Sequence, residues 1–89
     1  MARRRVSVRG TAVSLTPIEY RLLSTLARHA GRVLTHSQIL KEVWGPGSAG
    51  ESHYVRVYMN QLRQKLEANP ARPEFLLTET GVGYRLRDV

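Results

Sequence analysis

The sequence predicts a small α+β domain in which a β-hairpin, three α-helices and a second β-hairpin follow one another over 89 residues. Three observations support this order. Valines alternate with other residues near the N-terminus, two threonine-led capping patterns precede apolar residues at helical spacing, and two apolar runs separated by glycines close the chain. A chain of this length forms one core, so we expect a single domain over residues 1–89.

The N-terminal hairpin is expected over residues 5–15, where apolar residues alternate on either side of Arg9-Gly10-Thr11. Gly10 is expected to supply the turn, because glycine adopts the backbone angles of tight hairpin turns at little cost. The basic stretch at residues 2–5 is expected to be a frayed arm.

The first helix is predicted to begin at Thr16-Pro17-Ile18-Glu19. Threonine is a good N-cap, proline fits the first helical position, and the glutamate completes a capping box. The helix is expected to end at Gly31, which suits a left-handed cap. Its expected core positions are Ile18, Leu22, Leu23, Leu26 and Ala30.

The capping pattern recurs at Thr35-His36-Ser37-Gln38 and predicts a second, shorter helix. Gly45-Pro46-Gly47 is expected to stop this helix, and a loop is expected over residues 45–51. The apolar positions of the helix are Ile39, Leu40, Val43 and Trp44.

Residues 53–66 predict a third helix with two different faces, ended by Asn69-Pro70. At about 100° per residue, four apolar side chains share one stripe that is expected to be buried. These are Val55, Met59, Leu62 and Leu66. The opposite side carries His53, Val57, Asn60, Gln61 and Gln64, with Arg56 and Arg63 on a flank. Amides beside arginines are suited to contacting base edges and phosphates together. The alternative is an amphipathic helix with an ordinary polar outside.

The chain closes with two predicted strands, at residues 75–79 and 84–87, joined by Thr80-Gly81-Val82-Gly83. A hairpin, three helices and a closing hairpin describe a winged helix-turn-helix. In that arrangement the third helix enters the major groove of DNA, and the closing hairpin lies beside it over the backbone.

The composition favours a nucleic-acid ligand and argues against several other classes. With 14 basic and 7 acidic residues the net charge is +7, which is typical of proteins that bind polyanions. No run approaches the roughly 18 apolar residues of a membrane span, so a soluble protein is expected. The absence of cysteine favours a cytoplasmic origin. The chain has no cysteine, and its three histidines lack metal-ligand spacing. We therefore expect no disulfide, metal or cofactor and, because no nucleophile and base pair stands out, no enzymatic activity.

Several blocks resemble a known family over essentially the whole chain. They are residues 16–23, 31–35, 62–66 and 81–85, together with Val43-Trp44-Gly45. The chain resembles the DNA-binding effector domain of OmpR/PhoB-type response regulators. Residues 52–59, 62–67 and 70–73 are similar to a potassium-responsive branch of that family.

The resemblance implies a two-component transcription factor that controls a potassium-transport operon. It implies that phosphorylation of a receiver domain, absent from this chain, promotes head-to-tail binding of effector domains to direct repeats. It also implies that the N-terminal sheet is shortened, because the family has a longer sheet than residues 5–15 can make.

The third helix supplies most of the candidate DNA-binding residues. The resemblance places Arg63 at a phosphate-gripping position, with capping of a core face as the alternative. Asn60 and Gln61 stand where relatives often carry arginines that reach the major groove, and amides there can pair with adenine. Val57 opposes the apolar stripe and is a candidate for a thymine methyl group. For these three residues, plain solvent exposure is the alternative.

Other candidates lie toward the helix ends. Tyr54 and Arg56 occupy the first turns, where backbone N–H groups and the helix dipole favour phosphate, and Tyr54 is also a candidate for base contact. Gln64 belongs to the outer face, and Lys65 on the far flank is expected to reach the opposite DNA strand unless it is simply solvated. The resemblance makes Trp44 a phosphate donor through its indole N–H, with a core role as the alternative.

The closing hairpin adds further candidates. Tyr84 matches a family tyrosine near the DNA backbone, and Gly81 and Gly83 are expected to allow the close approach of a turn. Thr80 stands where several relatives carry an arginine that enters the minor groove, so deep minor-groove reading is not expected. Two further residues are candidates for phosphate contact or for plain solvation: Arg85 and Arg87.

The loop at residues 45–51 is longer than the three or four residues of a simple helix-turn-helix. In the resembled family this loop can face RNA polymerase, which makes Ser48 and Glu51 candidates, with a permissive surface loop as the alternative. A rival function is a basic protein-interaction module that docks on RNA polymerase or on another copy of itself. Such contacts would resist salt better and would not depend on Asn60 or Gln61.

Overall fold

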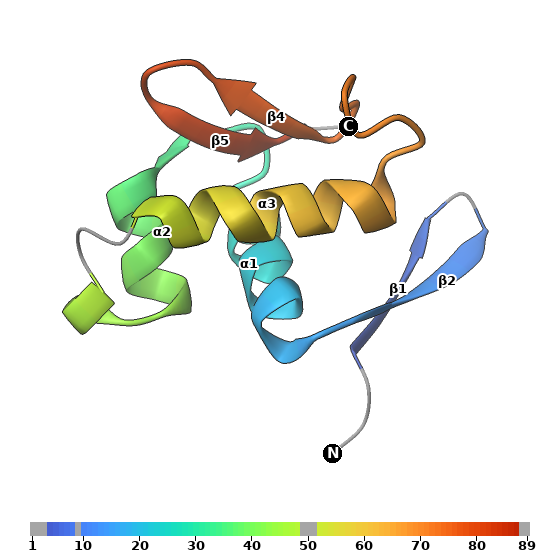
Figure 1. Ribbon diagram of the computed structural model, residues 1–89, viewed down its shortest axis with the longest axis horizontal. Coiled ribbons are helices and arrows are strands. Elements are labelled where there is room, and N and C mark those ends of the chain that lie inside the picture. Colours follow the sequence, from blue (N-terminus) through green and yellow to red (C-terminus); the bar gives the residue numbers. More distant parts are fainter. Residues whose placement is uncertain (1–3, 9, 49–51, 88–89) are drawn as a thin grey trace.

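The computed structural model describes residues 4–8, 10–48 and 52–87. In chain order the elements are β1 (Arg4–Val8), β2 (Thr11–Leu15), α1 (Pro17–Arg28), β3 (Leu34–Thr35), α2 (His36–Val43), the short 3₁₀ helix η1 (Pro46–Ser48), α3 (Ser52–Leu66), β4 (Leu76–Glu79) and β5 (Gly83–Leu86). Helix α3 crosses α1, the β4–β5 hairpin lies above α3, and the β1–β2 hairpin lies at the lower right (Figure 1). The predicted order of a hairpin, three helices and a hairpin is confirmed.

The N-terminal hairpin forms as predicted and begins slightly earlier. Strands β1 and β2 pair antiparallel from Arg4 opposite Leu15 to Val8 opposite Thr11. Gly10 has a φ of +79°, which is the left-handed conformation that the turn needs. The expectation of a frayed arm was wrong for residues 4 and 5, which belong to β1, whereas residues 2 and 3 lie outside the described part of the chain.

Both predicted capping boxes are present. The Thr16 hydroxyl accepts the Glu19 N–H, and the Glu19 carboxylate accepts the Thr16 N–H at 2.9 Å. Thr35 and Gln38 make the same reciprocal pair at the start of α2. Each box satisfies two donors that helix ends otherwise leave without partners, which fixes where α1 and α2 begin.

Helix α1 ends at Arg28, earlier than the predicted Gly31. Ala30 is exposed, so its predicted place in the core was wrong. Gly31, with a φ of +85°, donates its N–H to the carbonyl of Leu86 at 2.7 Å. The glycine therefore turns the chain toward β5 after the helix has already ended.

The C-terminal sheet has a third strand that the sequence did not predict. Leu34 and Thr35 of β3 pair antiparallel with Tyr84 and Gly83 of β5, giving the order β3-β5-β4. A two-residue strand is too short to show alternation, so only the fold reveals it. Strands β4 and β5 each begin one residue away from their predicted starts.

Gly83 lies in β5, and not in the turn where it was predicted. A Cβ atom on Gly83 would lie 1.9 Å from the Leu34 carbonyl oxygen, because β3 passes directly over this residue. The turn is made by Gly81 instead, whose φ is +79°. Gly83 is therefore needed for the close approach of β3 to β5.

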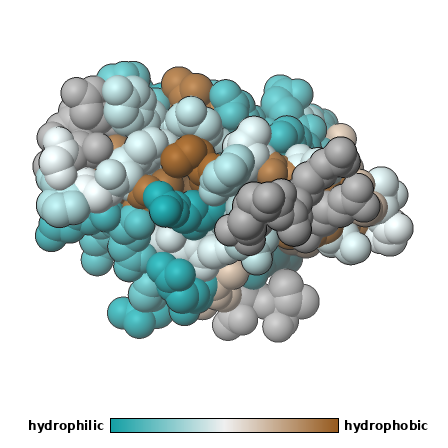
Figure 2. All heavy atoms as spheres, turned by 90° about the horizontal axis from the view of Figure 1, so that it is seen from below, coloured by the Kyte–Doolittle hydropathy of each residue, from teal (hydrophilic) through white to brown (hydrophobic). Residues whose placement is uncertain are grey.

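The predicted apolar stripe of α3 forms the centre of the core. Val55, Met59 and Leu62 are fully buried, and Leu66 is nearly so. They pack in one cluster with apolar side chains of α1, α2 and β4. Viewed from below, much of the surface is hydrophilic, and apolar side chains show only in limited areas (Figure 2). Within the described ranges no helix has the length and apolarity that a membrane span requires.

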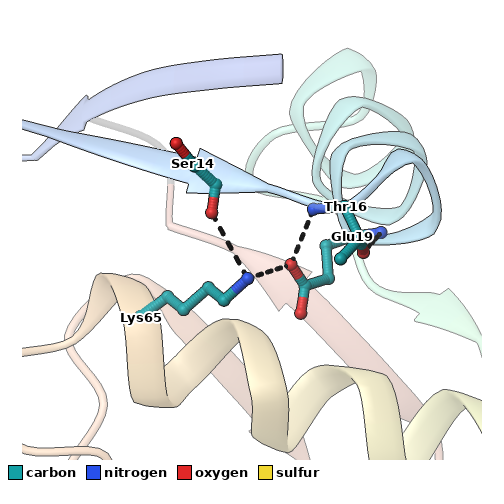
Figure 3. A network of polar contacts seen from close by, with 4 residues as sticks. All are labelled: Ser14, Thr16, Glu19 and Lys65. Atoms are coloured by element: carbon teal, nitrogen blue, oxygen red, sulfur yellow. Dashed lines mark hydrogen bonds and ion pairs between the residues drawn. The ribbon is translucent and has the colours of Figure 1, made fainter. Parts of the chain in front are cut away.

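A buried carboxylate joins α1 to the end of α3. Glu19 is 2% exposed and accepts a hydrogen bond from the Lys65 ammonium at 2.5 Å, while Lys65 also donates to the Ser14 carbonyl at 3.3 Å (Figure 3). Burial alone would raise the pKa of Glu19. Hydrogen bonds from Lys65 and Thr16, together with the Lys65 charge, outweigh burial and hold this pKa below its ordinary value of 4.5.

Gly83→Ala is expected to destabilise the domain by on the order of 3 kcal/mol, because the backbone of Leu34 cannot move away from the added methyl group. Gly47→Ala is the matched control, since nothing lies within 4 Å of its Cβ position. The control should change stability by less than about 0.5 kcal/mol. Urea unfolding measures both variants, and equal stabilities would refute the close β3–β5 approach.

Lys65→Met is expected to lower stability at neutral pH by roughly 1–2 kcal/mol, because it removes a charge-assisted bond to a buried carboxylate. The pKa of Glu19 is depressed in the folded protein. Its contribution to stability is therefore complete above the unfolded pKa and is lost as pH falls through the folded pKa. The variant should thus lose less stability than the parent on acidification.

The free energy of unfolding, measured from pH 7 down through the acid range, tests this expectation. Lys41→Met, which removes an exposed lysine from α2, controls for the loss of one charge. Parallel pH profiles for the parent and Lys65→Met would contradict the proposed coupling.

Candidate nucleic-acid interface

Helix α3 has the exposed polar face that the sequence predicts. Opposite the buried stripe, the exposed side chains are His53, Tyr54, Arg56, Val57, Asn60, Gln61 and Gln64. Val57 is 47% exposed and Tyr54 is 37% exposed, so both have surface left for a ligand. One helix thus supplies both the central core residues and an exposed, mainly polar face.

The polar groups at the middle of this face are uncommitted within the described part of the chain. Asn60 and Gln61 have no side-chain hydrogen bond there, and Arg56 has no ion pair there. Each amide offers two donors and one acceptor oxygen, and the guanidinium offers five donors. Chemically, this surface can donate to and accept from base edges while its arginine neutralises phosphate.

Aromatic side chains fix the start of α3 against the end of α2. The Trp44 ring centroid lies 5.8 Å from that of Tyr54 and 5.4 Å from that of Tyr58. Trp44 is half-buried, so it packs on α3 and still has exposed surface. Tyr58 was not among the predicted site residues, although its position four residues after Tyr54 places both rings on one side of the helix.

Arg63 has partners within the protein that the sequence analysis did not anticipate. Its Nε and Nη2 donate to the Leu76 carbonyl at 3.0 and 2.7 Å, and Nη2 also donates to the Thr78 hydroxyl at 2.6 Å. The guanidinium carbon lies 5.6 Å from the centroid of the Tyr84 ring. These contacts agree better with the alternative role on the core side than with a simple phosphate grip.

Two other predicted DNA contacts have partners within the protein. Lys65 bonds to Glu19 and to the Ser14 carbonyl, so its ammonium faces the N-terminal elements and not the exposed face of α3. Tyr84 is only 5% exposed and packs edge-on against His36, with ring centroids 5.2 Å apart. A ring covered in this way packs with the core and leaves little surface for a ligand, and its expected contact with the DNA backbone stays a prediction.

The β4–β5 hairpin, called the wing below, exposes its turn, and the arginines on and after β5 have partners within the protein. Thr80, Gly81 and Val82 are exposed. Two arginines were candidates for phosphate contact. Arg85 pairs with Glu79 at 2.6 Å, and Arg87 donates weakly to the Glu74 carbonyl at 3.5 Å. The tip of the wing is therefore open to a ligand.

Glu67 is a structural residue that the sequence analysis did not single out. It follows α3 directly, is buried, and accepts the backbone N–H groups of Glu74, Phe75 and Leu76 at 2.7–2.9 Å. Its position four residues after Arg63 was the available signal, because the two side chains leave the helix on the same side. The helix itself ends at Leu66, the predicted last residue, and Asn69-Pro70 lies beyond it.

The loop after α2 is described only in part. Gly45 has a φ of +101° and is followed by η1. Ser48 ends η1, but its side chain and the whole of Glu51 lie outside the described residues. Their predicted exposure to a protein partner therefore stays a prediction.

Comparison with known protein sequences gives consistent matches. The family described as "Transcriptional regulatory protein, C terminal" matches residues 10–86. The KDP operon transcriptional regulatory protein KdpE of Escherichia coli (strain K12) is 60% identical over 73 residues, which are 82% of this chain and 32% of that protein. The transcriptional regulatory protein KdpE of Mycobacterium tuberculosis (strain ATCC 25618 / H37Rv) is 51% identical over 85 residues, or 96% of this chain and 38% of the relative. The chain thus spans about a third of these relatives.

Solved structures agree with the fold. The response regulator DrrB, an OmpR/PhoB homologue of Thermotoga maritima, matches with a TM-score of 0.84 and 28% identity over 94% of this chain and 38% of its own. The Klebsiella pneumoniae RstA DNA-binding domain, in complex with the RstA box, matches with a TM-score of 0.84 and 31% identity over 94% of this chain and 83% of its own. The predicted winged helix-turn-helix class is confirmed.

Proposed function

The chain belongs to the family described as "Transcriptional regulatory protein, C terminal", and on this basis we propose that it binds double-stranded DNA sequence-specifically through the exposed face of α3. The observation that carries the proposal is that Asn60 and Gln61 on the exposed face, and Arg56 on its flank, have no side-chain hydrogen bond or ion pair in the described part, while the other side of the helix is buried. The RstA DNA-binding domain, which is 31% identical to this chain, has been solved in complex with the RstA box, and this supports the choice of ligand.

In the proposed complex α3 lies in the major groove, which is about 12 Å wide and admits one helix. Asn60 and Gln61 read base edges, with adenine the partner that suits a bidentate amide. Val57 contacts a thymine methyl group, and Gln64 extends the polar contact along the helix. Arg56 binds phosphate, so the central amides specify sequence while the arginine positions the helix.

The elements at either end of α3 hold the DNA backbone. Tyr54 lies in the first turns of α3, where the backbone N–H groups and helix dipole favour an anion, and its exposed side also reaches toward bases. Trp44 donates its indole N–H to the same region. Thr80 and Gly81 of the wing tip approach the backbone on the other side, without the long side chain that deep minor-groove reading needs.

The wider role proposed is that of the effector domain of a cytoplasmic two-component regulator controlling a potassium-transport operon. The relatives named as KDP operon and KdpE regulators support this role. Phosphorylation of a receiver domain would favour head-to-tail pairing on direct repeats, and residues 45–51, including Ser48 and Glu51, would face RNA polymerase. The domain itself is proposed to act without catalysis or cofactor.

Fluorescence anisotropy with a direct-repeat duplex from a potassium-transporter promoter and a scrambled duplex, over a salt series, tests the proposed function. We expect a preference of about tenfold or more for the direct repeat, with the logarithm of affinity falling steeply with that of salt. Equal binding to both duplexes would leave a generic polyanion binder. Absence of binding would favour the rival protein-interaction module.

Arg56→Ala is expected to weaken binding to both duplexes alike and to reduce the salt slope by about 1, because one phosphate contact releases about 0.9 counterion. Arg32→Ala removes the same charge from an exposed position before β3 and is the matched control. An unchanged slope for Arg56→Ala, measured by anisotropy at several salt concentrations, would remove Arg56 from the interface.

Gln61→Ala is expected to reduce affinity for the direct-repeat duplex by about tenfold, since a bidentate base contact discriminates by roughly 1–3 kcal/mol. Affinity for the scrambled duplex should hardly change, because phosphate contacts stay in place. Competition titrations with both duplexes measure the ratio. Equal losses on the two duplexes would show that Gln61 does not read sequence.

A further inference from the structure

Two charged side chains at the end of α3 hold the backbone of a single residue in the wing. The Glu67 carboxylate accepts the N–H of Leu76 at 2.8 Å, and the Arg63 guanidinium donates twice to the carbonyl of Leu76. Glu67 also accepts the N–H groups of the two preceding residues, Glu74 and Phe75. We call this arrangement the Arg63–Glu67 clamp.

The clamp satisfies backbone groups that β4 would otherwise bury without partners. In the described sheet β4 is an edge strand that pairs only with β5, and Leu76 itself is fully buried. A buried N–H or C=O without a partner is costly, and an edge strand presents a row of both. Arg63 and Glu67 therefore replace a neighbouring strand with charge-assisted bonds, which are shorter and stronger than neutral ones.

Arg63 also connects the clamp to more distant parts of the wing. The same Nη2 group donates to the Thr78 hydroxyl, two residues further along β4. The guanidinium lies near the face of the Tyr84 ring on β5, at a distance compatible with a cation–π contact. Because one rigid guanidinium touches both strands, a tilt of the wing relative to α3 would break several contacts at once.

We propose that the Arg63–Glu67 clamp fixes the angle between α3 and the wing, so that both meet DNA as one body, and that Arg63 is a positioning residue for DNA binding. The DNA part of this inference rests on the proposed function. The wing tip, Thr80 to Val82, directly follows β4, so the clamp controls where these exposed residues lie. A phosphate ligand at this position would need only a positive charge, whereas the clamp needs the planar guanidinium.

Conservative and non-conservative variants of Arg63 distinguish a positioning role from direct phosphate binding. Lysine keeps the charge but cannot supply two parallel donors to one carbonyl and another to the Thr78 hydroxyl. We expect Arg63→Lys and Arg63→Met to lose affinity for the direct-repeat duplex by similar factors, about tenfold each, which corresponds to roughly 1.4 kcal/mol. Arg32→Lys, the same change at an exposed position before β3 and outside the proposed interface, should keep the parent affinity.

A double-mutant cycle tests whether Arg63 acts through the wing. Thr80→Glu places a negative charge at the tip and should weaken binding to DNA. In the Arg63→Met background the wing is free to tilt away from DNA. The fold loss of affinity caused by Thr80→Glu should therefore be at least about threefold smaller than in the parent, a larger difference than independent sites show. Additive losses, or recovery of binding in Arg63→Lys to within about twofold of the parent, would overturn the positioning role.

A measurement without DNA separates failure of the clamp from failure of the proposed function. Residual dipolar couplings report the angle between α3 and β4–β5, and hydrogen exchange of the Leu76 amide reports its bond to Glu67. Thr78→Val removes one bond with little risk to folding and serves if Arg63→Met does not fold. We expect faster exchange and altered couplings in the variants. Unchanged couplings and exchange rates in the variants would refute the clamp. Equal affinity of the parent protein for the direct-repeat and scrambled duplexes would refute only the proposed function.

Discussion

The structure depends on one helix having two surfaces of opposite character. Helix α3 buries Val55, Met59 and Leu62 completely, yet leaves its other side polar and exposed. Burial of each such side chain is worth about 1.5–3 kcal/mol, so the stripe fixes the rotation of the helix about its axis. That rotation in turn decides which amides and which arginine face outward. The candidate interface is thus a direct consequence of how the core packs.

Side-chain contacts join the two ends of α3 to the end of α2, to α1 and to β4. Aromatic contacts with Trp44 hold its first turns, the Lys65–Glu19 pair joins its last turn to α1, and Arg63 with Glu67 joins that turn to β4. Several charged side chains, among them Arg63, Lys65 and Glu67, thus bind other groups of the domain. The net charge of +7 is a property of the whole chain, whereas the exposed face of α3 carries Arg56, which has no ion pair in the described part. Specificity in such a domain depends on placement of a few groups more than on bulk charge.

Local patterns in the sequence were enough to predict most of the fold. The capping boxes at Thr16 and Thr35, the hairpin at Gly10 and the two faces of α3 each involve neighbours within a few residues, and all are confirmed. Strand β3 could not be predicted, because its two residues become a strand only by pairing with a segment near the other end of the chain. Gly83 was wrongly predicted to lie in the turn for the same reason. A glycine is needed there because the Leu34 carbonyl, far away in the sequence, leaves no room for a Cβ atom.

The sequence predicted correctly which side chains of α3 are exposed but not which of them have distant partners, and contact of these residues with DNA stays a prediction. Periodicity placed Val57, Asn60 and Gln61 outside correctly. It could not show that Lys65 would find a carboxylate 46 residues away, or that Arg63 would find a carbonyl 13 residues on. The most direct test of the outward face is a nuclear magnetic resonance titration of the domain with a direct-repeat duplex. Side-chain amide signals of Asn60 and Gln61 should shift first and most, whereas changes confined to the β1–β2 hairpin and the back of α1 would contradict the assignment of α3 as the DNA-reading surface.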